Sequence, residues 1–580
     1  MIGGFFQVFC SFFSGILTTL AIPNEIFHFG SVVFGMTALI PLYIAAKSAK
    51  SYKNAAGIFA LDALVTHIFS SFWLANFKDF AVFTLGASAL GTACIEAMAG
   101  CIFFAPFGNP AGIVQKEIHL KKIHLKKIQL KFSCDFSSPE FRVFWFASVR
   151  VVYEWAKSTG FLAYPWGTLS MSAFCAKPLM QSADIFGVYG ITFLFAFISG
   201  TLAESVISFG KKKCGAKISG LQKCAFALLA GFLLYGAFRL CQSRPILKTL
   251  NAVLVQQNRD PWALRNDDNA IKISMELSQK GIDEFSKRGK KTDIVVWSEA
   301  VLRHSFPESY VRYALRPEEE PLISFIRRAQ IPFLIGGSYT LDEEKDQSAN
   351  AALMFDRDGF FRGFYGKTHL VPFAEVIPGI EIPIVKKMMS RVVGISNGWT
   401  PGEEFVLFDI EISSKEKKPF PSFSVIDLEE PISSQEKTAR ARLATPICFE
   451  DAFPDICGPF HKMGAEVFMN ITDDSWSKTA SAEYQHFVVA AFRAIEYRTT
   501  LVRSTNSGFT AVVDSAGKIV QSAPLFEEAY LCAEIPIYQW RETVHSRYTN
   551  WFVHLILIFM AATLFIVASE NFSQLKNFKE

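Results

Sequence analysis

Two kinds of hydrophobic pattern divide this chain of 580 residues. Long apolar runs fill the N-terminal part and recur near the C-terminus, whereas short apolar and polar segments alternate between them. A helix that crosses a bilayer needs roughly 20 mostly apolar residues. Eight runs approach that length, at residues 5–21, 27–46, 55–74, 81–104, 143–155, 185–202, 218–240 and 551–568. The pattern therefore predicts a membrane domain over residues 1–241 with seven spanning helices, and an eighth spanning helix within residues 550–580.

Ionisable side chains interrupt three of the predicted spans. Asp62 and His67 lie in the third, Glu96 lies in the fourth, and Arg150 and Glu154 lie in the short fifth. Charged groups inside a bilayer are costly, so they indicate either function or pairing. These side chains could line a solute pathway, or they could pair with one another where helices pack. The sequence leaves both interpretations open.

The segment between the seventh and eighth spans, residues 242–549, alternates two periodicities. Short apolar runs such as DIVVWSE at 293–299 and AEVFMNIT at 465–472 predict strands, and the segments 270–287 and 480–497 predict helices between them. Such alternation is typical of a layered α/β sandwich. Two segments interrupt it. Residues 376–394 are apolar with two adjacent lysines and predict a lid or membrane-touching arm, whereas the charged stretch 410–440 predicts a surface insertion.

The distribution of lysine and arginine predicts an orientation in the membrane. Basic residues are concentrated after the second, fourth and sixth spans and in the C-terminal tail, which eight spans place on one side. That side is expected to be the cytoplasm, so the α/β domain faces outward, towards the periplasm. The five-residue repeat at 118–131, IHLKKIHLKKIQLK, belongs to one of these loops. We expect it to be a solvated basic segment near anionic lipid headgroups.

Composition agrees with a mixed membrane and globular chain and narrows the chemistry. Hydrophobic residues make up 50%, charged residues make up 19%, and mean hydropathy is +0.24. The net charge is only +4, and the globular part contains no run of basic residues with interleaved aromatics. No nucleic-acid partner is therefore expected. The 11 cysteines form no metal-ligand spacing, and no phosphate-binding loop is present. We therefore expect neither metal nor cofactor.

Three residues of the globular segment suggest thiol chemistry. Cys448 lies in TPICFED, Glu299 ends the run DIVVWSE, and Lys367 lies in FYGKTHLVPFAE. Singly, they read as an inert buried thiol, a strand-end acid and a solvated lysine. Together they supply the parts of an acyl-transfer site, because a thiol attacks an acyl carbon only as thiolate and needs a base. A desolvated carboxylate can be that base, and an ammonium can stabilise the oxyanion.

A resemblance sharpens this interpretation. The segments WSEA, YGKTHLVPFAE and ICFED and the tract at 483–520 resemble the nitrilase superfamily. With seven spans before that region and one after it, the chain resembles the bacterial apolipoprotein N-acyltransferase family. The resemblance implies an αββα sandwich in which Glu299 is the general base, Lys367 the oxyanion donor and Cys448 the nucleophile. It also implies four supporting residues in the pocket: Glu375, Glu450, Asn350 and Trp476.

The resemblance further implies a two-step reaction in the bacterial inner membrane. Cys448 attacks a phospholipid ester, and a lysophospholipid leaves. The thioester then passes its acyl chain to the α-amino group of the lipid-modified N-terminal cysteine of an apolipoprotein. The chain departs from the family pattern in having Ser298 where proline is usual and Phe449 where tyrosine is usual. The Phe-Gly pair usual near Trp476 is also missing.

Two other functions share some of these features. A membrane-anchored nitrilase-type amidase would use the same three residues with water as acceptor, but a single anchor would serve it. A transporter whose outer domain only binds solute would use the ionisable residues of the spans. A complete set of Glu299, Lys367 and Cys448 argues against that function.

Overall fold

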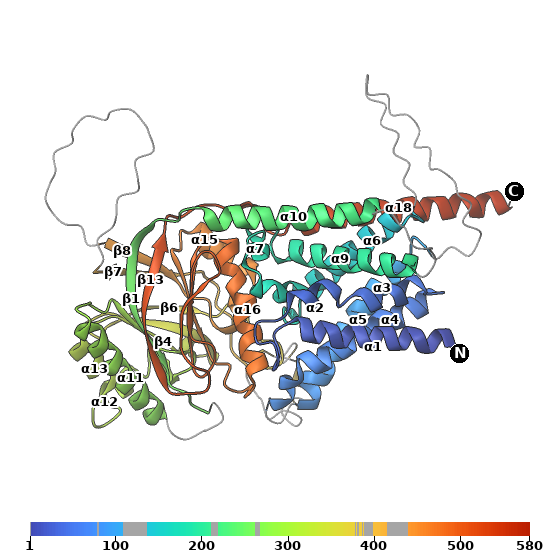
Figure 1. Cartoon of the computed structure of the whole chain (residues 1–580). Coiled ribbons are helices and arrows are strands. Elements are labelled where there is room, and N and C mark those ends of the chain that lie inside the picture. The colour runs from blue at the N-terminus through green and yellow to red at the C-terminus, as the bar shows by residue number, and fades with distance from the viewer. Residues whose placement is uncertain are drawn as a thin grey trace. The chain divides into compact units, whose positions relative to one another are not determined.

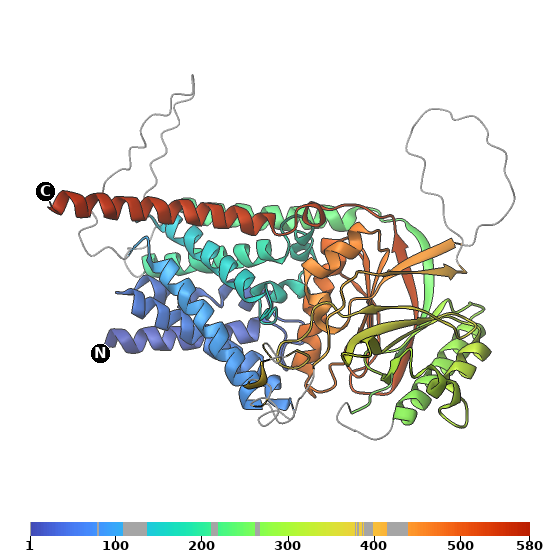
Figure 2. The same ribbon diagram turned by 180° about the vertical axis from the view of Figure 1, so that it is seen from behind.

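The computed structural model describes residues 2–77, 81–107, 136–209, 219–260, 267–376, 398–413 and 439–579, with positions 379, 382–384 and 387. It forms two compact units (Figures 1 and 2). Residues 1–75, 81–238 and 550–580 form the first, called here the helical unit, and residues 76–80 and 239–549 form the second, the sandwich unit. The basic repeat at 118–131 lies outside the described residues, as does most of the expected lid at 376–394 and insertion at 410–440.

The described part of the helical unit is built from helices. Its longer helices are α1 (Ile2–Ala21), α4 (Tyr52–Ser70), α5 (Ala81–Phe104), α6 (Pro139–Lys157), α9 (Val188–Phe209), α10 (Gly220–Cys241) and α18 (Trp551–Lys579). Its shorter ones are α2 (Val32–Thr37), α3 (Ile40–Lys47), α7 (Lys177–Met180), α8 (Ala183–Phe186) and the 3₁₀ turns η1 (Phe72–Asn76) and η2 (Leu169–Cys175).

Five of the described helices are long and apolar enough to cross a membrane: α1, α5, α9, α10 and α18. The second expected span, 27–46, is not one helix but the pair α2 and α3. Pro41 explains the break, because proline has no N–H to continue the hydrogen bonding of a preceding turn and suits the start of a new helix. Helices α4 and α6 cover the third and fifth expected spans. The total of eight spans stays a prediction.

Four of the five ionisable residues expected in α4, α5 and α6 pair with one another, whereas His67 lies with its Nε2 2.8 Å from the hydroxyl of Ser88. Arg150 Nη1 lies 2.8 Å from Glu96 Oε1 and 3.7 Å from Asp62 Oδ2, and its Nε lies 3.2 Å from Glu154 Oε1. Glu154 also accepts a hydrogen bond of 2.6 Å from Thr192 of α9. The side chains of Asp62, Glu96, Arg150, Glu154 and Thr192 are all buried. The network therefore joins four helices, which favours the interpretation that these charges hold the bundle together.

The sandwich unit contains two sheets. The first has the order β13 (Ala529–Tyr538), β1 (Ile246–Gln256), β2 (Ile294–Val296), β4 (Phe333–Asp342), β5 (Gln347–Phe355) and β6 (Phe361–Gly366), with β3 (Leu302–Phe306) paired to β4. The second has the order β12 (Ile519–Ser522), β11 (Ala511–Val513), β10 (Thr500–Thr505), β9 (Val467–Thr472), β8 (Ala439–Ala444) and β7 (Leu407–Ile412). The central pairs β1–β2–β4 and β8–β9–β10 are parallel.

Helices cover the outer faces of the two sheets. They are α11 (Asp267–Lys287), α12 (Tyr310–Leu315) and α13 (Leu322–Ala329) beside the first sheet, and α15 (Pro454–Lys462) and α16 (Ala480–Glu496) beside the second (Figure 1), with the short α17 (Val544–Arg547) before α18. Strands β1 and β13 of the first sheet contact β10 of the second. The layers are therefore helix, sheet, sheet and helix, and the expected α/β sandwich is confirmed.

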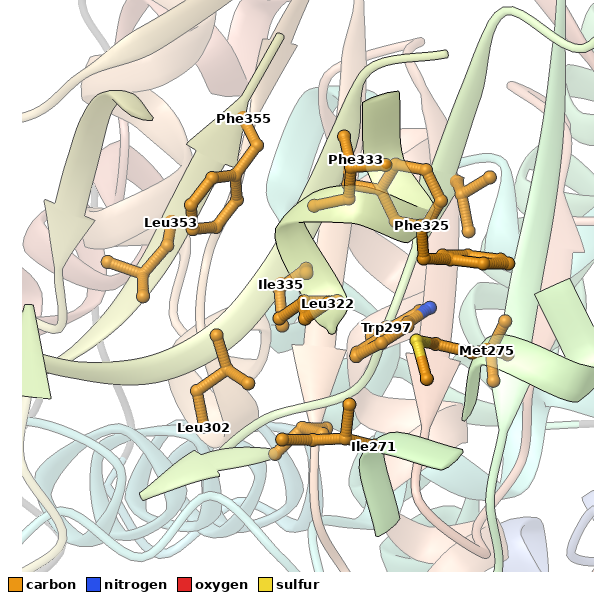
Figure 3. Packing of buried hydrophobic residues seen from close by; sticks show 14 of the residues in the cluster. Ile271, Met275, Trp297, Leu302, Leu322, Phe325, Phe333, Ile335, Leu353 and Phe355 are labelled. Atoms are coloured by element: carbon orange, nitrogen blue, oxygen red, sulfur yellow. The ribbon is translucent and has the colours of Figure 1, made fainter. Parts of the chain in front are cut away.

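The first sheet is anchored to its helices by an aromatic core. Trp297, Phe333 and Phe325 pack with Met275 and Ile271 of α11 (Figure 3). Such rings bury large apolar areas, and the indole N–H of a buried tryptophan needs a partner. Trp297 Nε1 finds one in Ser278, 2.9 Å away. This anchor fixes the end of β2, three residues before Glu299.

Candidate active site

Cys448 lies on a strained turn at the end of β8. Before it, Ile447 still bridges Ile471 of β9, and Cys448 itself begins the 3₁₀ turn η3 (Cys448–Ala452) with φ of 53°. A non-glycine residue with positive φ is costly and persists only where its surroundings enforce it. Asn470 helps to hold Cys448 in this conformation, because its side-chain amide donates to the carbonyls of Pro446 and Cys448 at 3.0 and 2.8 Å.

Glu299 is placed by close packing of the first sheet. It lies three residues beyond the end of β2, and the backbone of β4 lies against it: a Cβ on Gly336 would approach the Glu299 Cα to 2.5 Å. Only glycine permits this approach. Gly336 N donates to Ser298 O at 3.1 Å, and the amide of Asp473, which follows β9, donates to Glu299 Oε2 at 2.9 Å. Strands of both sheets therefore fix the carboxylate.

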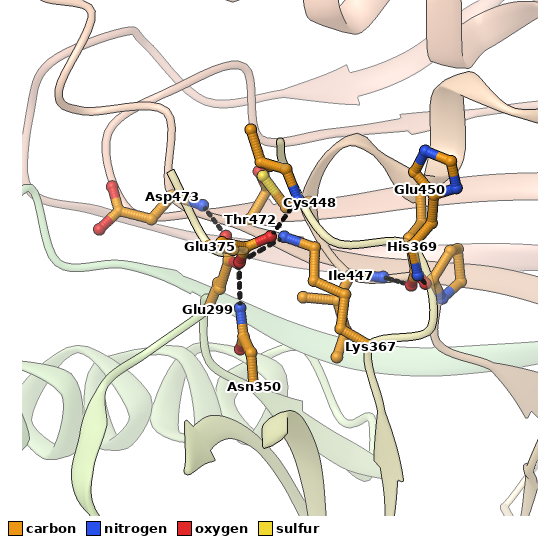
Figure 4. Close-up of polar contacts among 12 residues, drawn as sticks. Glu299, Asn350, Lys367, His369, Glu375, Ile447, Cys448, Glu450, Thr472 and Asp473 are labelled. Carbon is orange, nitrogen blue, oxygen red and sulfur yellow. Dashed lines mark hydrogen bonds and ion pairs between the residues drawn. The ribbon is translucent and has the colours of Figure 1, made fainter. Parts of the chain in front are cut away.

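Lys367 is fully buried just after β6 and is bound by two carboxylates. Its Nζ lies 2.8 Å from Glu375 Oε1 and 3.3 Å from Glu299 Oε1. Asn350 of β5 donates to the same two oxygens, at 2.7 Å to Glu299 and 3.0 Å to Glu375. Figure 4 shows Cys448 beside this group, so the structure brings all three expected chemical residues together.

Burial sets the protonation states of this group. It raises the pKa of the Cys448 thiol well above its ordinary value, and the charge of Glu299 raises it further. Burial also raises the pKa of Glu299, although Lys367 opposes that shift. For Lys367, burial alone would lower the pKa, but Cys448 in its thiolate form and the carboxylates of Glu299 and Glu375 outweigh burial and raise it. The resting nucleophile is therefore a thiol, next to a carboxylate with raised basicity and a persistent ammonium.

Glu450 joins the nucleophile turn to the loop that follows β6. Its carboxylate accepts hydrogen bonds from the backbone amides of Ile447, Thr368 and His369 at 2.8, 2.8 and 3.0 Å. The hydroxyl of Tyr365 donates to it at 3.0 Å. Because Lys367 lies within this loop, Glu450 fixes the ammonium and the thiol relative to each other without contacting either through these bonds.

The positions that depart from the family pattern have partners of their own. The ring of Phe449 lies beneath the ammonium of Lys367, 5.6 Å from Nζ to the ring centroid, which is a cation–π contact. The hydroxyl of Ser298 accepts from Gln257 at 2.7 Å. Trp476, an expected pocket residue, lies in the loop after β9 with its ring 5.4 Å from that of Phe77. Of the four expected supporting residues, Glu375 and Asn350 contact the Glu299–Lys367 pair directly.

Sequence reasoning missed a second charged group behind Cys448. His486 of α16 lies between two carboxylates, with Nδ1 2.8 Å from Asp474 and Nε2 3.1 Å from Asp451 Oδ1. Arg503 of β10 pairs with both carboxylates. The available signal was a histidine in the expected helix at EYQHFVV and an arginine in the segment TLVRST. Within the described residues, no group of histidine, cysteine and acidic side chains could hold a metal ion.

Comparison with known proteins covers nearly the whole chain. The carbon-nitrogen hydrolase family matches residues 253–544, and the N-terminal domain of apolipoprotein N-acyltransferases matches residues 14–201. Apolipoprotein N-acyltransferase 2 of Treponema denticola is 39% identical over 96% of this chain and 97% of its own. The apolipoprotein N-acyltransferase of Borreliella burgdorferi is 30% identical over 98% of both chains. A solved carbon-nitrogen hydrolase from Helicobacter pylori is 16% identical, with a TM-score of 0.33 over 50% of this chain and 89% of its own.

The hydrogen bonds of Glu450 predict a sensitive position. Glu450→Gln places an amide donor where the carboxylate accepts from several donors, so one buried donor loses its partner. We expect a loss of about 1–3 kcal/mol in unfolding free energy, measured as a lower thermal midpoint of the purified chain in detergent. Glu404→Gln, at an exposed glutamate of the same unit, is the matched control. Equal midpoints for the two variants would contradict the role given to Glu450.

Proposed function

The chain belongs to the apolipoprotein N-acyltransferase family and is an acyltransferase, and we propose that Cys448, Glu299 and Lys367 carry out its reaction. An acyl chain passes from a phospholipid, through a thioester on Cys448, to the α-amino group of the diacylglyceryl-modified N-terminal cysteine of an apolipoprotein. The observation that carries the residue assignment is the buried Glu299–Lys367 pair beside the strained cysteine turn.

In the first step Glu299 takes the thiol proton of Cys448 as the sulfur attacks the ester carbonyl of the phospholipid. The raised pKa of the carboxyl suits it to this transfer, because a base works best when its pKa lies near the working pH. The ammonium of Lys367 stabilises the oxyanion that forms. The tetrahedral intermediate then collapses, the C–O bond breaks, and Glu299 returns the proton to the lysophospholipid that leaves.

In the second step the α-amino group of the apolipoprotein attacks the thioester. Glu299 accepts a proton from the amine, Lys367 again stabilises the oxyanion, and the C–S bond breaks to release the amide, while Glu299 returns the proton to the departing thiolate of Cys448. Conversion of a thioester to an amide is downhill, so no nucleotide is required. Glu375 and Asn350 support both steps by holding Lys367 and Glu299 at fixed positions throughout.

The apolar helices fit a membrane protein, and we propose that it lies in the bacterial cytoplasmic membrane with the sandwich unit on the periplasmic side. The loops rich in lysine and arginine support this orientation. It suits the chemistry, because the outer face lacks ATP and the reaction requires none. Hydrolysis by an amidase would use the same sandwich, but the match of residues 14–201 to the acyltransferase N-terminal domain favours acyl transfer.

Replacement of the nucleophile tests the covalent step. Cys448→Ala is expected to abolish N-acylation, and Cys448→Ser also fails because a hydroxyl is far less acidic than a thiol. Intact-mass measurement after mixing with phospholipid should detect a fatty acyl adduct on the wild-type chain and on neither Cys448 variant. Cys457→Ala and Cys532→Ala, at buried cysteines of the same unit, are the controls and should still form the adduct. An adduct on Cys448→Ala would exclude the mechanism.

Replacement of the proposed base and the proposed oxyanion donor tests whether each is needed to form the acyl-enzyme. Glu299→Gln keeps the shape of the side chain but not its basicity, and Lys367→Met keeps the stem but not the charge. Both are expected to slow formation of the acyl-enzyme by roughly a hundredfold or more, followed by intact mass over time. Glu404→Gln serves again as the exposed control. Wild-type rates of adduct formation in either active-site variant would refute its assignment.

The proposed orientation predicts a labelling pattern. In spheroplasts, a membrane-impermeant maleimide should react with Glu344→Cys, at an exposed site of the sandwich unit, in a chain whose exposed native cysteines are replaced by serine. The same reagent should not reach Lys53→Cys, at an exposed site in the first turn of α4, until the cells are lysed. The opposite pattern would reverse the topology.

A further inference from the structure

Geometry alone fixes the charge of His486. Both of its ring nitrogens face carboxylates, with Nδ1 2.8 Å from Asp474 and Nε2 3.1 Å from Asp451. Both carboxylates also pair with the guanidinium of Arg503, which favours their ionised forms, so each contact needs an N–H from the ring, and a neutral imidazole has only one. His486 is therefore an imidazolium. Its side chain and those of Asp451 and Asp474 are buried, so water screens the interaction little.

The two carboxylates belong to the two segments that carry the reaction. Asp451 lies in the 3₁₀ turn that begins with Cys448. Asp474 follows Asp473, whose backbone amide donates to Glu299. His486 approaches both from α16 and so spans the turn of the nucleophile and the loop that holds the base. Neither connection depends on substrate.

We propose that His486 is a positioning residue of the acyl-transfer site: as an imidazolium it locks the nucleophile turn to the loop that holds Glu299, and it balances the charge of Asp474 beside Cys448. This inference rests on the proposed function, because it assigns His486 a part in the same reaction. His486 does not contact the reacting atoms through these bonds. It acts through Asp451 and Asp474.

The charge count explains why the imidazolium matters for the thiol. His486 and Arg503 together balance Asp451 and Asp474, so the group is neutral as a whole. The charge of Asp474 raises the pKa of Cys448, after the larger effects of burial and Glu299. Loss of the imidazolium would leave one negative charge uncompensated beside the thiol. The thiol would then ionise less readily, and its attack on the ester would slow.

The surroundings keep His486 charged at neutral pH. Burial alone would lower its pKa, but Asp474 and Asp451 outweigh burial and Arg503 and raise it to about 9. Glu483, on the same helix, also faces the group. Burial, and then Asp474, raises the pKa of Glu483 well above its ordinary value, which favours its neutral form. The four groups named above therefore remain the charged ones.

A charge-rescue experiment on the full-length chain in detergent tests the proposal. His486→Gln, Asp474→Asn and the double variant are compared for acyl-adduct formation on Cys448 from phospholipid vesicles, and for alkylation of Cys448 by iodoacetamide at fixed pH. Alkylation of the other cysteines of the chain is followed separately, by the masses of their peptides. We expect His486→Gln to slow both reactions about tenfold, the change that one pKa unit causes in the thiolate fraction. The double variant restores neutrality and should recover most of the alkylation rate.

A merely structural role for His486 predicts a different result. The double variant would then be no faster than His486→Gln, and that outcome overturns the proposal, as do wild-type rates in His486→Gln. The matched control is His545→Gln, at a buried histidine of the same unit whose pKa burial lowers to about 3. It should leave alkylation of Cys448 unchanged, whatever it does to the thermal midpoint.

The experiment still decides the proposal if a variant does not fold or if no acyl adduct forms. If His486→Gln does not fold, Asp474→Asn decides alone: with one negative charge removed, Cys448 should be alkylated faster than in the wild type, and a slower or equal rate overturns the proposal. If the wild-type chain forms no acyl adduct from phospholipid, the proposed function fails, while the alkylation rates still decide the role of His486.

Discussion

The buried ammonium of Lys367 is the constraint on which the site depends. A fully buried charge is prohibitively costly unless it is paired and hydrogen-bonded. Glu375 and Glu299 meet that need at 2.8 and 3.3 Å. Glu299 can do so only because Gly336 lets β4 pass against its backbone. Asn350 then bridges the two carboxylates and keeps their like charges apart from direct contact. The first sheet thus carries both the proposed base and the proposed oxyanion donor.

The second sheet carries the proposed nucleophile, and polar contacts between the sheets hold its turn in place. Glu450 joins the turn of Cys448 to the loop of Lys367, and the amide of Asp473 reaches across to Glu299. The positive φ of Cys448 is a strain that these contacts and Asn470 maintain. Packing of two sheets alone would bring the three residues near one another. The hydrogen bonds of Glu450 and Asp473 hold the segments that carry them in a fixed relation.

Much of this arrangement was accessible from the sequence, and the reasons for the exceptions are physical. The chemical residues follow short apolar runs, so strand ends could be located and the three residues recognised. The break at Pro41 was missed because hydropathy averages over a window and ignores the backbone N–H that proline lacks. The group of Asp451, Asp474 and His486 was missed for another reason. These residues are scattered along the chain, and only the packing of α16 on the second sheet makes them neighbours.

The charged groups around Lys367 and around His486 differ in balance, and that difference separates their roles. Around Lys367, two carboxylates face one cation, so a proton can be taken up by Glu299 at modest cost, and burial already raises its pKa. Around Asp451 and Asp474, two cations face two carboxylates, and every charge is compensated. A proton moved within that group would break an ion pair in a medium of low polarity. The unbalanced group is therefore suited to catalysis and the balanced one to holding Cys448 in place.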